Sequence, residues 1–299
     1  MIPDTLLANL HSRLQSMRAP SGAFRANPDG APNLEATAYA VLASAPTSAP
    51  GAVKWLVGQQ LPSGGFVLTP GIDHASWSSA VALLALGSDP SAPPDVLARG
   101  ARWLVASRGR DFSWWIRFLQ LMTPKERRVD QDLTLDGWSW HPDAQSWVEP
   151  TALAILALKK LDSRIPIAGC KERIAEGETL ILDRMCPGGG WNYGNKRVLD
   201  FQLEPFADVT ALALLALRGS AHSAAIRESL ARLAEILERE RSALALALAV
   251  LAFDAHGVDS TRTRRQLEDW YAAGHVWSEA RVLALSLLAL EQRGGVLLS

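Results

Sequence analysis

Residues 210–217 read Thr-Ala-Leu-Ala-Leu-Leu-Ala-Leu, and this phrase decides the fold. It lacks glycine and proline and is apolar nearly all round, which is typical of a helix that is packed on every side. Similar phrases occur six times, and three of the five intervals between them are 36 to 42 residues long. The copies begin at Thr37, Ser79, Thr151, Thr210, Leu246 and Leu283. Repetition at this period indicates an array of structural repeats.

A more polar segment with charges on one face precedes each apolar phrase. These segments cover residues 4–17, 50–61, 93–107, 168–185, 221–239 and 262–272. Alternation of outer amphipathic helices with inner apolar helices predicts an all-α protein, an (α/α)6 toroid of about six helical hairpins. We expect residues 1–299 to form one domain, with an aromatic insertion at about 108–136 and a central cavity inside the ring.

A glycine-containing turn followed by an aromatic residue links the two helices of several repeats. The copies are Gly22-Ala23-Phe24, Gly64-Gly65-Phe66, Asp136-Gly137-Trp138 and Gly189-Gly190-Trp191. In the first three, the aromatic residue lies 13 residues before the Thr or Ser of the next apolar phrase, and in the fourth it lies 19 residues before it. The glycines favour a tight turn, and we expect the aromatic side chain to fill the gap between neighbouring hairpins.

Composition excludes several classes of function. Hydrophobic residues make up 48% of the chain and charged residues 20%, which predicts a folded globular protein. With 30 basic and 31 acidic residues the net charge is −1, so we expect no nucleic-acid partner. Residues 1–10 show no signal-peptide pattern, and the apolar runs are shorter than the roughly 20 residues that span a bilayer. The expected location is cytoplasmic.

Two motifs resemble those of a known superfamily. The segment Trp55-Leu56-x-x-x-Gln60-x-x-x-Gly64-Gly65-Phe66 resembles the Gln-Trp motif of triterpene cyclases. Gly189-Gly190-Trp191 with Thr210–Leu215 resembles the repeat of prenyltransferases and squalene cyclases. Four of the six repeats show the motif, while the last two are degenerate. The chain thus resembles the squalene–hopene cyclase and protein prenyltransferase superfamily, which implies a toroid that binds or transforms a hydrophobic, isoprenoid-like substrate by acid catalysis.

The resemblance also selects candidate catalytic residues. Class II cyclases carry an Asp-x-Asp-Asp-Thr-Ala run at the start of an inner helix, and this chain has no such run. At the position of the middle Asp, two residues before the Thr of the phrase, it has Glu35, Glu149 and Asp208. We predict that these three acids meet at one rim of the cavity and act as proton donors. The alternative is that they cap the free N–H groups of the inner helices.

Aromatic and acidic side chains supply candidate substrate-binding residues. Eleven Trp stand against ten Phe and Tyr combined, and aromatic faces stabilise cations. The aromatic candidates are Trp77, Trp138, Trp140, Trp147, Trp191 and Tyr193, which alternatively are packing plugs. Asp130 and Asp132 form a second acidic pair that either contacts a substrate cation or lies in a solvated loop. No metal or cofactor is expected, because the zinc motif of prenyltransferases is missing.

The insertion and the fold leave further alternatives open. Residues 112–122 are rich in aromatic side chains and predict a lid, a channel lining or a peripheral membrane contact, or else an extra helix outside the ring. A non-catalytic toroid that binds a lipid or a partner protein is the first alternative to an isoprenoid enzyme. A carbohydrate-active α/α barrel with paired carboxylates is the second.

Overall fold

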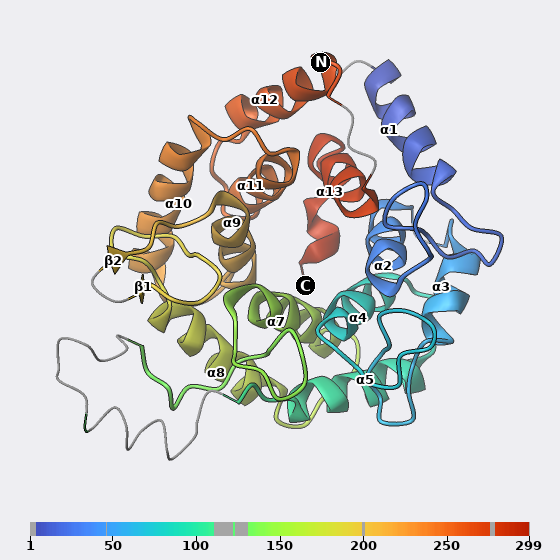
Figure 1. Cartoon of the computed structure of the whole chain (residues 1–299), viewed down its shortest axis with the longest axis horizontal. Helices are drawn as coiled ribbons and strands as arrows, with labels where there is room; N and C mark the ends of the chain where they lie inside the picture. The colour runs from blue at the N-terminus through green and yellow to red at the C-terminus, as the bar shows by residue number, and fades with distance from the viewer. Residues whose placement is uncertain are drawn as a thin grey trace.

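The computed structural model describes residues 4–45, 47–110, 122, 131–198, 201–275 and 279–298. Within these residues, twelve α-helices alternate between an outer and an inner ring (Figure 1). The inner helices are α2 (Leu34–Ala43), α4 (Ser78–Ser88), α7 (Val148–Asp162), α9 (Ala207–Ala216), α11 (Ala243–Ala255) and α13 (Ala280–Leu290). The outer helices are α1 (Asp4–Ser16), α3 (Pro50–Val57), α5 (Pro94–Ala106), α8 (Cys170–Asp183), α10 (Ser223–Leu237) and α12 (Thr261–Ala272). The prediction of an all-α toroid is confirmed.

The ring closes between its first and last hairpins. Each inner helix packs on the next in chain order, and α13 packs on α2 and on α1. Arg293, just after α13, donates hydrogen bonds of 2.6 Å to the carbonyls of Ala43 and Ser44 at the end of α2. His11 of α1 lies 2.5 Å from Glu291. Polar contacts therefore add to the packing of α13 on α1 and α2, where the first and last hairpins meet.

The two rings differ in burial as the sequence pattern predicts. In α11 every residue from Ala245 to Phe253 is buried, because the helix has neighbours on all sides. In α12 only Thr263 and Leu267 are buried, and the remaining residues of the helix are at least partly accessible to solvent. Small alanine side chains let the inner helices approach closely, and the core is the layer between the two rings.

A pair of hydrogen bonds explains the spacing of 13 residues between aromatic and hydroxyl side chains. The backbone N–H groups of Phe24, Phe66, Trp138 and Trp191 donate to the hydroxyls of Thr37, Ser79, Thr151 and Thr210 at 2.9, 2.9, 3.0 and 2.9 Å, respectively. The hydroxyls of Ser79, Thr151 and Thr210 donate in return to the carbonyl of the same aromatic residue, whereas the Thr37 hydroxyl donates to the carbonyl of Asn33 at 2.7 Å and lies 3.4 Å from that of Phe24. We call this pairing the hydroxyl clasp. It satisfies backbone groups of a buried turn that lies outside the helices.

The fourth clasp spans 19 residues because a β-hairpin occupies the extra length. Strands β1 (Arg197–Val198) and β2 (Phe201–Gln202) pair antiparallel, with Arg197 opposite Gln202. The sequence shows the longer spacing here but predicts no strands. The turn that begins this segment needs glycine, since Gly189 has a φ of +93° and a Cβ there would lie 3.0 Å from the backbone of Glu228.

The two ends of the ring differ. At the C-terminal ends of the inner helices, the short 3-10 helix η2 (Gly294–Leu297) lies near the centre of the ring (Figure 1). Ser88 donates to the carbonyl of Val296 at 3.1 Å, and Lys160 donates to the carbonyl of Leu298 at 2.5 Å. At the opposite end lie the N-termini of the inner helices, which we call the rim.

The predicted insertion falls largely outside the described residues. Of residues 112–122, only Met122 is described, and its side chain is exposed. In the part of the chain that the structure covers, no helix is long and apolar enough to cross a bilayer.

Candidate functional site

Two of the three predicted acids meet at the rim around an arginine. Glu35 lies in the first turn of α2 and Glu149 in the first turn of α7. Arg281 of α13 donates one Nη2 hydrogen bond of 2.6 Å to Glu149 Oε1 and an Nη1 hydrogen bond of 3.4 Å to Glu35 Oε1. Because α13 and α7 stand on opposite sides of the inner ring, this ion network spans the ring opening.

Burial and charge perturb the groups of this network. Burial raises the pKa of Glu35, Arg281 opposes the rise, and the carboxylates of Glu149 and Glu279 add to it. Burial alone would lower the pKa of Arg281, but Tyr39, Glu149 and Glu35 outweigh burial and hold the pKa above its usual range. The ring of Tyr39 lies 5.5 Å from the guanidinium carbon. Arg281 Nε is buried and has no hydrogen-bond partner among the residues that the structure covers, so one donor of the network is unused there.

Asp208, the third predicted acid, lies at the rim but outside the ion network. It is half-buried in the first turn of α9, and its Oδ1 accepts a hydrogen bond of 2.9 Å from the N–H of Val209. This contact is the one that the capping alternative predicts. The charge of Asp208 nevertheless acts on Tyr193: burial raises the pKa of Tyr193, and the charges of Asp208 and Glu149 add to the rise.

Partly exposed aromatic side chains lie at the N-terminal ends of the inner helices α4, α7 and α9. Trp77 and Trp140 pack edge to face with ring centroids 4.9 Å apart. Tyr193, 42% exposed, packs on Phe206, 50% exposed, at 5.3 Å. Trp147, also half-buried, immediately precedes α7 and lies against Gly194. The rim therefore combines charged groups with accessible aromatic faces.

Other predicted substrate-binding residues lie elsewhere. Trp191 is fully buried and donates its indole N–H to the carbonyl of Ile181 at 2.6 Å, so the packing alternative holds for it. Trp138 is 4% exposed and stacks under the guanidinium of Arg173 at 3.5 Å, between hairpins rather than at the rim.

Asp132 of the predicted acidic pair is not brought to the rim either. The exposed Asp132 accepts from Thr134 and lies beside Asp183 at the end of outer helix α8, while Asp130 lies outside the described residues. Among the side chains that the structure describes, no group of three His, Cys, Asp or Glu is arranged to hold a metal ion.

The sequence pattern missed Arg281, Glu279 and Phe206. A signal for Arg281 existed, because it is the single charged residue within the eleven residues of α13. A charge in a helix that is otherwise buried requires a partner, and the acids at the starts of other inner helices were the available partners.

Comparisons with known proteins define the class of fold. No protein-family model matches the chain, and no curated protein matches it. The structure is similar to cellobiose 2-epimerase from Spirochaeta thermophila DSM 6192, with a TM-score of 0.60 and 14% identity over 97% of this chain and 98% of that chain. It is also similar to a protein from Actinoplanes, with a TM-score of 0.59 and 14% identity over 96% and 98% of the two chains.

A third similar structure is native alpha-2-macroglobulin from Escherichia coli, spanning domain MG7 to the C-terminus. The TM-score is 0.52 and the identity 14%, over 94% of this chain and 41% of that one. The fold and the rim thus define an α/α toroid with a polar, aromatic-bordered site. A sugar epimerase and an alpha-2-macroglobulin share this architecture, so the fold alone assigns no substrate and does not establish the prenyltransferase family.

Proposed function

We propose that the rim binds a carbohydrate or a similarly hydroxyl-rich ligand. The observation that carries the proposal is the network of Glu35, Arg281 and Glu149 across the ring opening, bordered by half-exposed aromatic rings. Carboxylates accept hydrogen bonds from hydroxyl groups, and a guanidinium donates them in a fixed geometry. Aromatic faces pack on the apolar C–H face of a sugar ring. The rim therefore offers hydrogen-bond partners for the hydroxyl groups of a sugar and aromatic surfaces for its C–H face.

The likeness to cellobiose 2-epimerase supports carbohydrates as the ligand class. The two chains match over nearly their whole lengths, although 14% identity transfers the fold and no residue role. The charged, partly accessible rim gives less support to the isoprenoid hypothesis, because covering ionic groups with a hydrocarbon removes their water without replacing its hydrogen bonds. A carbohydrate replaces those hydrogen bonds.

The same residues supply acid–base chemistry for a bound sugar. Exchange of the proton on a carbon next to a carbonyl requires a group that removes the proton as a base and returns one as its conjugate acid. Glu35, whose pKa is raised, is the proposed proton carrier. Arg281 holds Glu149 at 2.6 Å and orients its second oxygen for a ligand hydroxyl. In this proposal Tyr193 and Trp147 form the wall on which the ring packs.

Isothermal titration calorimetry with cellobiose and glucose tests the binding. We expect the wild-type protein to bind at least one of the two, and Glu149→Gln to weaken binding about tenfold, the equivalent of one charge-assisted hydrogen bond. Glu235→Gln is the matched control, because Glu235 on outer helix α10 is an exposed partner of Arg232 in a similar ion pair. Absence of binding, or equal binding by Glu149→Gln and wild type, contradicts the proposal.

A second measurement separates binding from turnover. Incubation of the protein with cellobiose in D2O, followed by NMR, detects deuterium at the carbon next to the reducing-end carbonyl. Incorporation that is lost in Glu35→Gln supports the acid–base role, whereas binding without incorporation identifies a non-catalytic carbohydrate-binding toroid. A farnesyl lipid that displaces the sugar from the rim supports the isoprenoid hypothesis instead.

A further inference from the structure

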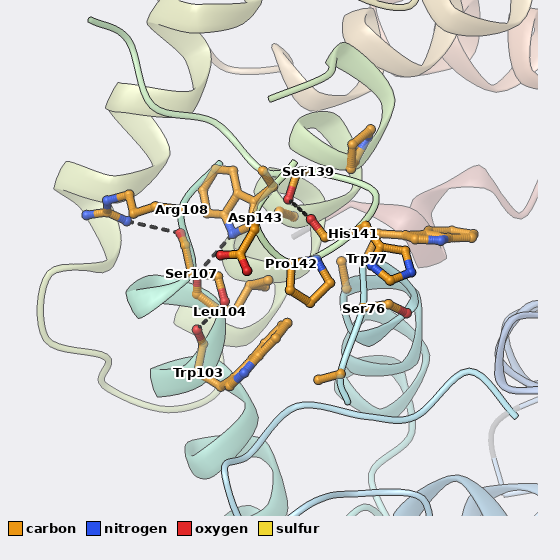
Figure 2. Close-up of a pocket in the computed structure, with 15 residues that line it drawn as sticks. Ser76, Trp77, Trp103, Leu104, Ser107, Arg108, Ser139, His141, Pro142 and Asp143 are labelled. Atoms are coloured by element: carbon orange, nitrogen blue, oxygen red, sulfur yellow. Dashed lines mark hydrogen bonds between the residues drawn. The ribbon is translucent and has the colours of Figure 1, made fainter. Parts of the chain in front are cut away.

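A cavity of about 190 Å³ lies between α4, α5 and α7, outside the centre of the ring (Figure 2). Its floor includes Ala80 of α4 and Ala154 of α7, and three indole side chains line it: Trp77, Trp103 and Trp138. The exposed residues His141, Pro142 and Asp143 lie at its mouth. The cavity is therefore a slot that opens to solvent on one side.

The first turn of α7 separates this slot from the rim. Glu149 extends toward Arg281 across the ring opening, whereas the next residue, Pro150, lines the slot. Successive residues on a helix point about 100° apart, so one turn serves two separate sites.

The dimensions of the slot restrict its ligand to a small ring. A cavity of about 150 Å³ with an apolar lining holds benzene in another protein. The slot is slightly larger, and its walls are flat indoles above a floor of methyl groups. Planar apolar molecules of one or two fused rings match this shape, since their faces contact the indoles and their edges reach the alanines.

The charges around the mouth are already paired within the protein. Asp143 lies 2.7 Å from Arg110. Arg108 lies 3.4 Å from Glu176 and 3.7 Å from Asp136. A ligand with its own charge would find no unpaired carboxylate or guanidinium among the described residues of the mouth.

Ser139, one of several polar side chains that line the slot, can serve a neutral ligand. The hydroxyl of Ser139 donates to the carbonyl of His141 at 2.6 Å. A hydroxyl that donates its proton in this way still has oxygen lone pairs that accept hydrogen bonds. A single N–H or O–H donor on a ligand would therefore find an acceptor here.

We propose that the slot binds an uncharged, planar compound of one or two fused rings with at most one polar donor. This ligand differs in class from the hydroxyl-rich ligand of the rim. The slot is a second site, and its occupancy does not depend on the proposed function of the rim.

Binding of 5-fluoroindole, followed by ¹⁹F NMR, tests the slot directly. The wild-type protein should bind the probe with submillimolar affinity, and indole-3-acetate and tryptamine should compete about tenfold more weakly than indole because each carries a charge. Ala154→Leu fills the slot from its floor and should abolish binding. Trp103→Leu removes one wall and should weaken binding about tenfold, and it serves where Ala154→Leu fails to fold.

Trp55→Leu is the matched control, because Trp55 is also a half-buried tryptophan on an outer helix but does not line the slot. It should bind 5-fluoroindole as the wild type does. The proposal is overturned if folded wild-type protein shows no binding at millimolar probe. It is equally overturned if Trp103→Leu binds as tightly as Trp55→Leu, or if a charged analogue binds more tightly than indole.

Discussion

Replacement of Arg281 by methionine should destabilise the fold in a pH-dependent way. The variant leaves Glu149, 9% exposed, and Glu35, 22% exposed, facing each other without a cation. Removing one partner of a buried ion pair costs roughly 3–5 kcal/mol, and the residual exposure of both carboxylates places this case near 3 kcal/mol at neutral pH. Methionine keeps most of the apolar stem, so packing contributes little to the loss.

The pH dependence follows from the raised pKa of Glu35. Arg281 opposes that rise in the wild type, so its removal raises the pKa of Glu35 further. A carboxyl whose pKa is raised by folding leaves stability intact at low pH and reduces it as the pH rises through the folded-state pKa. The deficit of Arg281→Met should therefore grow from acid to neutral pH. Adding Glu35→Gln and Glu149→Gln should restore most of the stability.

Urea unfolding followed by circular dichroism at several pH values measures this deficit. Arg232→Met is the control, since Arg232 pairs with the exposed carboxylates of Glu204 and Glu235 and should lose less than about 1 kcal/mol. A loss for Arg281→Met below about 1 kcal/mol at neutral pH, or a loss that does not change with pH, would refute the argument that the network is buried and spans the ring.

Three further predictions concern the fold and the rim. Thr151→Val removes a hydroxyl clasp and leaves the N–H of Trp138 buried without an acceptor, so the free energy of unfolding should fall by roughly 1–3 kcal/mol. The control Thr179→Val changes an exposed threonine and should lose about 0.5 kcal/mol or less. Equal losses for the two variants would contradict the clasp. Trp191→Ala should cost roughly 3–5 kcal/mol in the same assay, and a loss below about 1 kcal/mol would show that the side chain is not a plug. Glu35→Gln should gain stability relative to wild type as the pH rises above 4.5, because the amide has no charge to bury. If the difference in unfolding free energy between the variant and the wild type does not change with pH, Glu35 is not desolvated.

Much of the fold was predictable because its determinants repeat. Every outer segment predicted from charge pattern became an outer helix with ends within four residues of the prediction, as in α8 and α12. The spacing of 13 residues had a cause that the pattern did not reveal, namely the hydroxyl clasp between backbone and side chain. A repeated contact leaves a repeated distance in the sequence, which is why these features were visible.

The site was only partly predictable because its contacts do not repeat. Glu35 and Glu149 were found through their shared position before a threonine, but the partner that joins them comes from α13, 132 residues from Glu149. The slot beside Trp138 depends on the packing of three elements and on small side chains at Ala80 and Ala154. Alanine occurs throughout the inner helices, so nothing in the local sequence distinguishes these two positions.

Hydrogen exchange with and without saturating cellobiose tests most directly whether the rim is the ligand site. We predict slower exchange at residues 144–149 and 206–208, which lie at the starts of α7 and α9 on the rim, and unchanged exchange at residues 294–298, which lie at the opposite end of the ring. Protection confined to residues 294–298 or to the outer helices, with no change at the rim segments, would contradict the account.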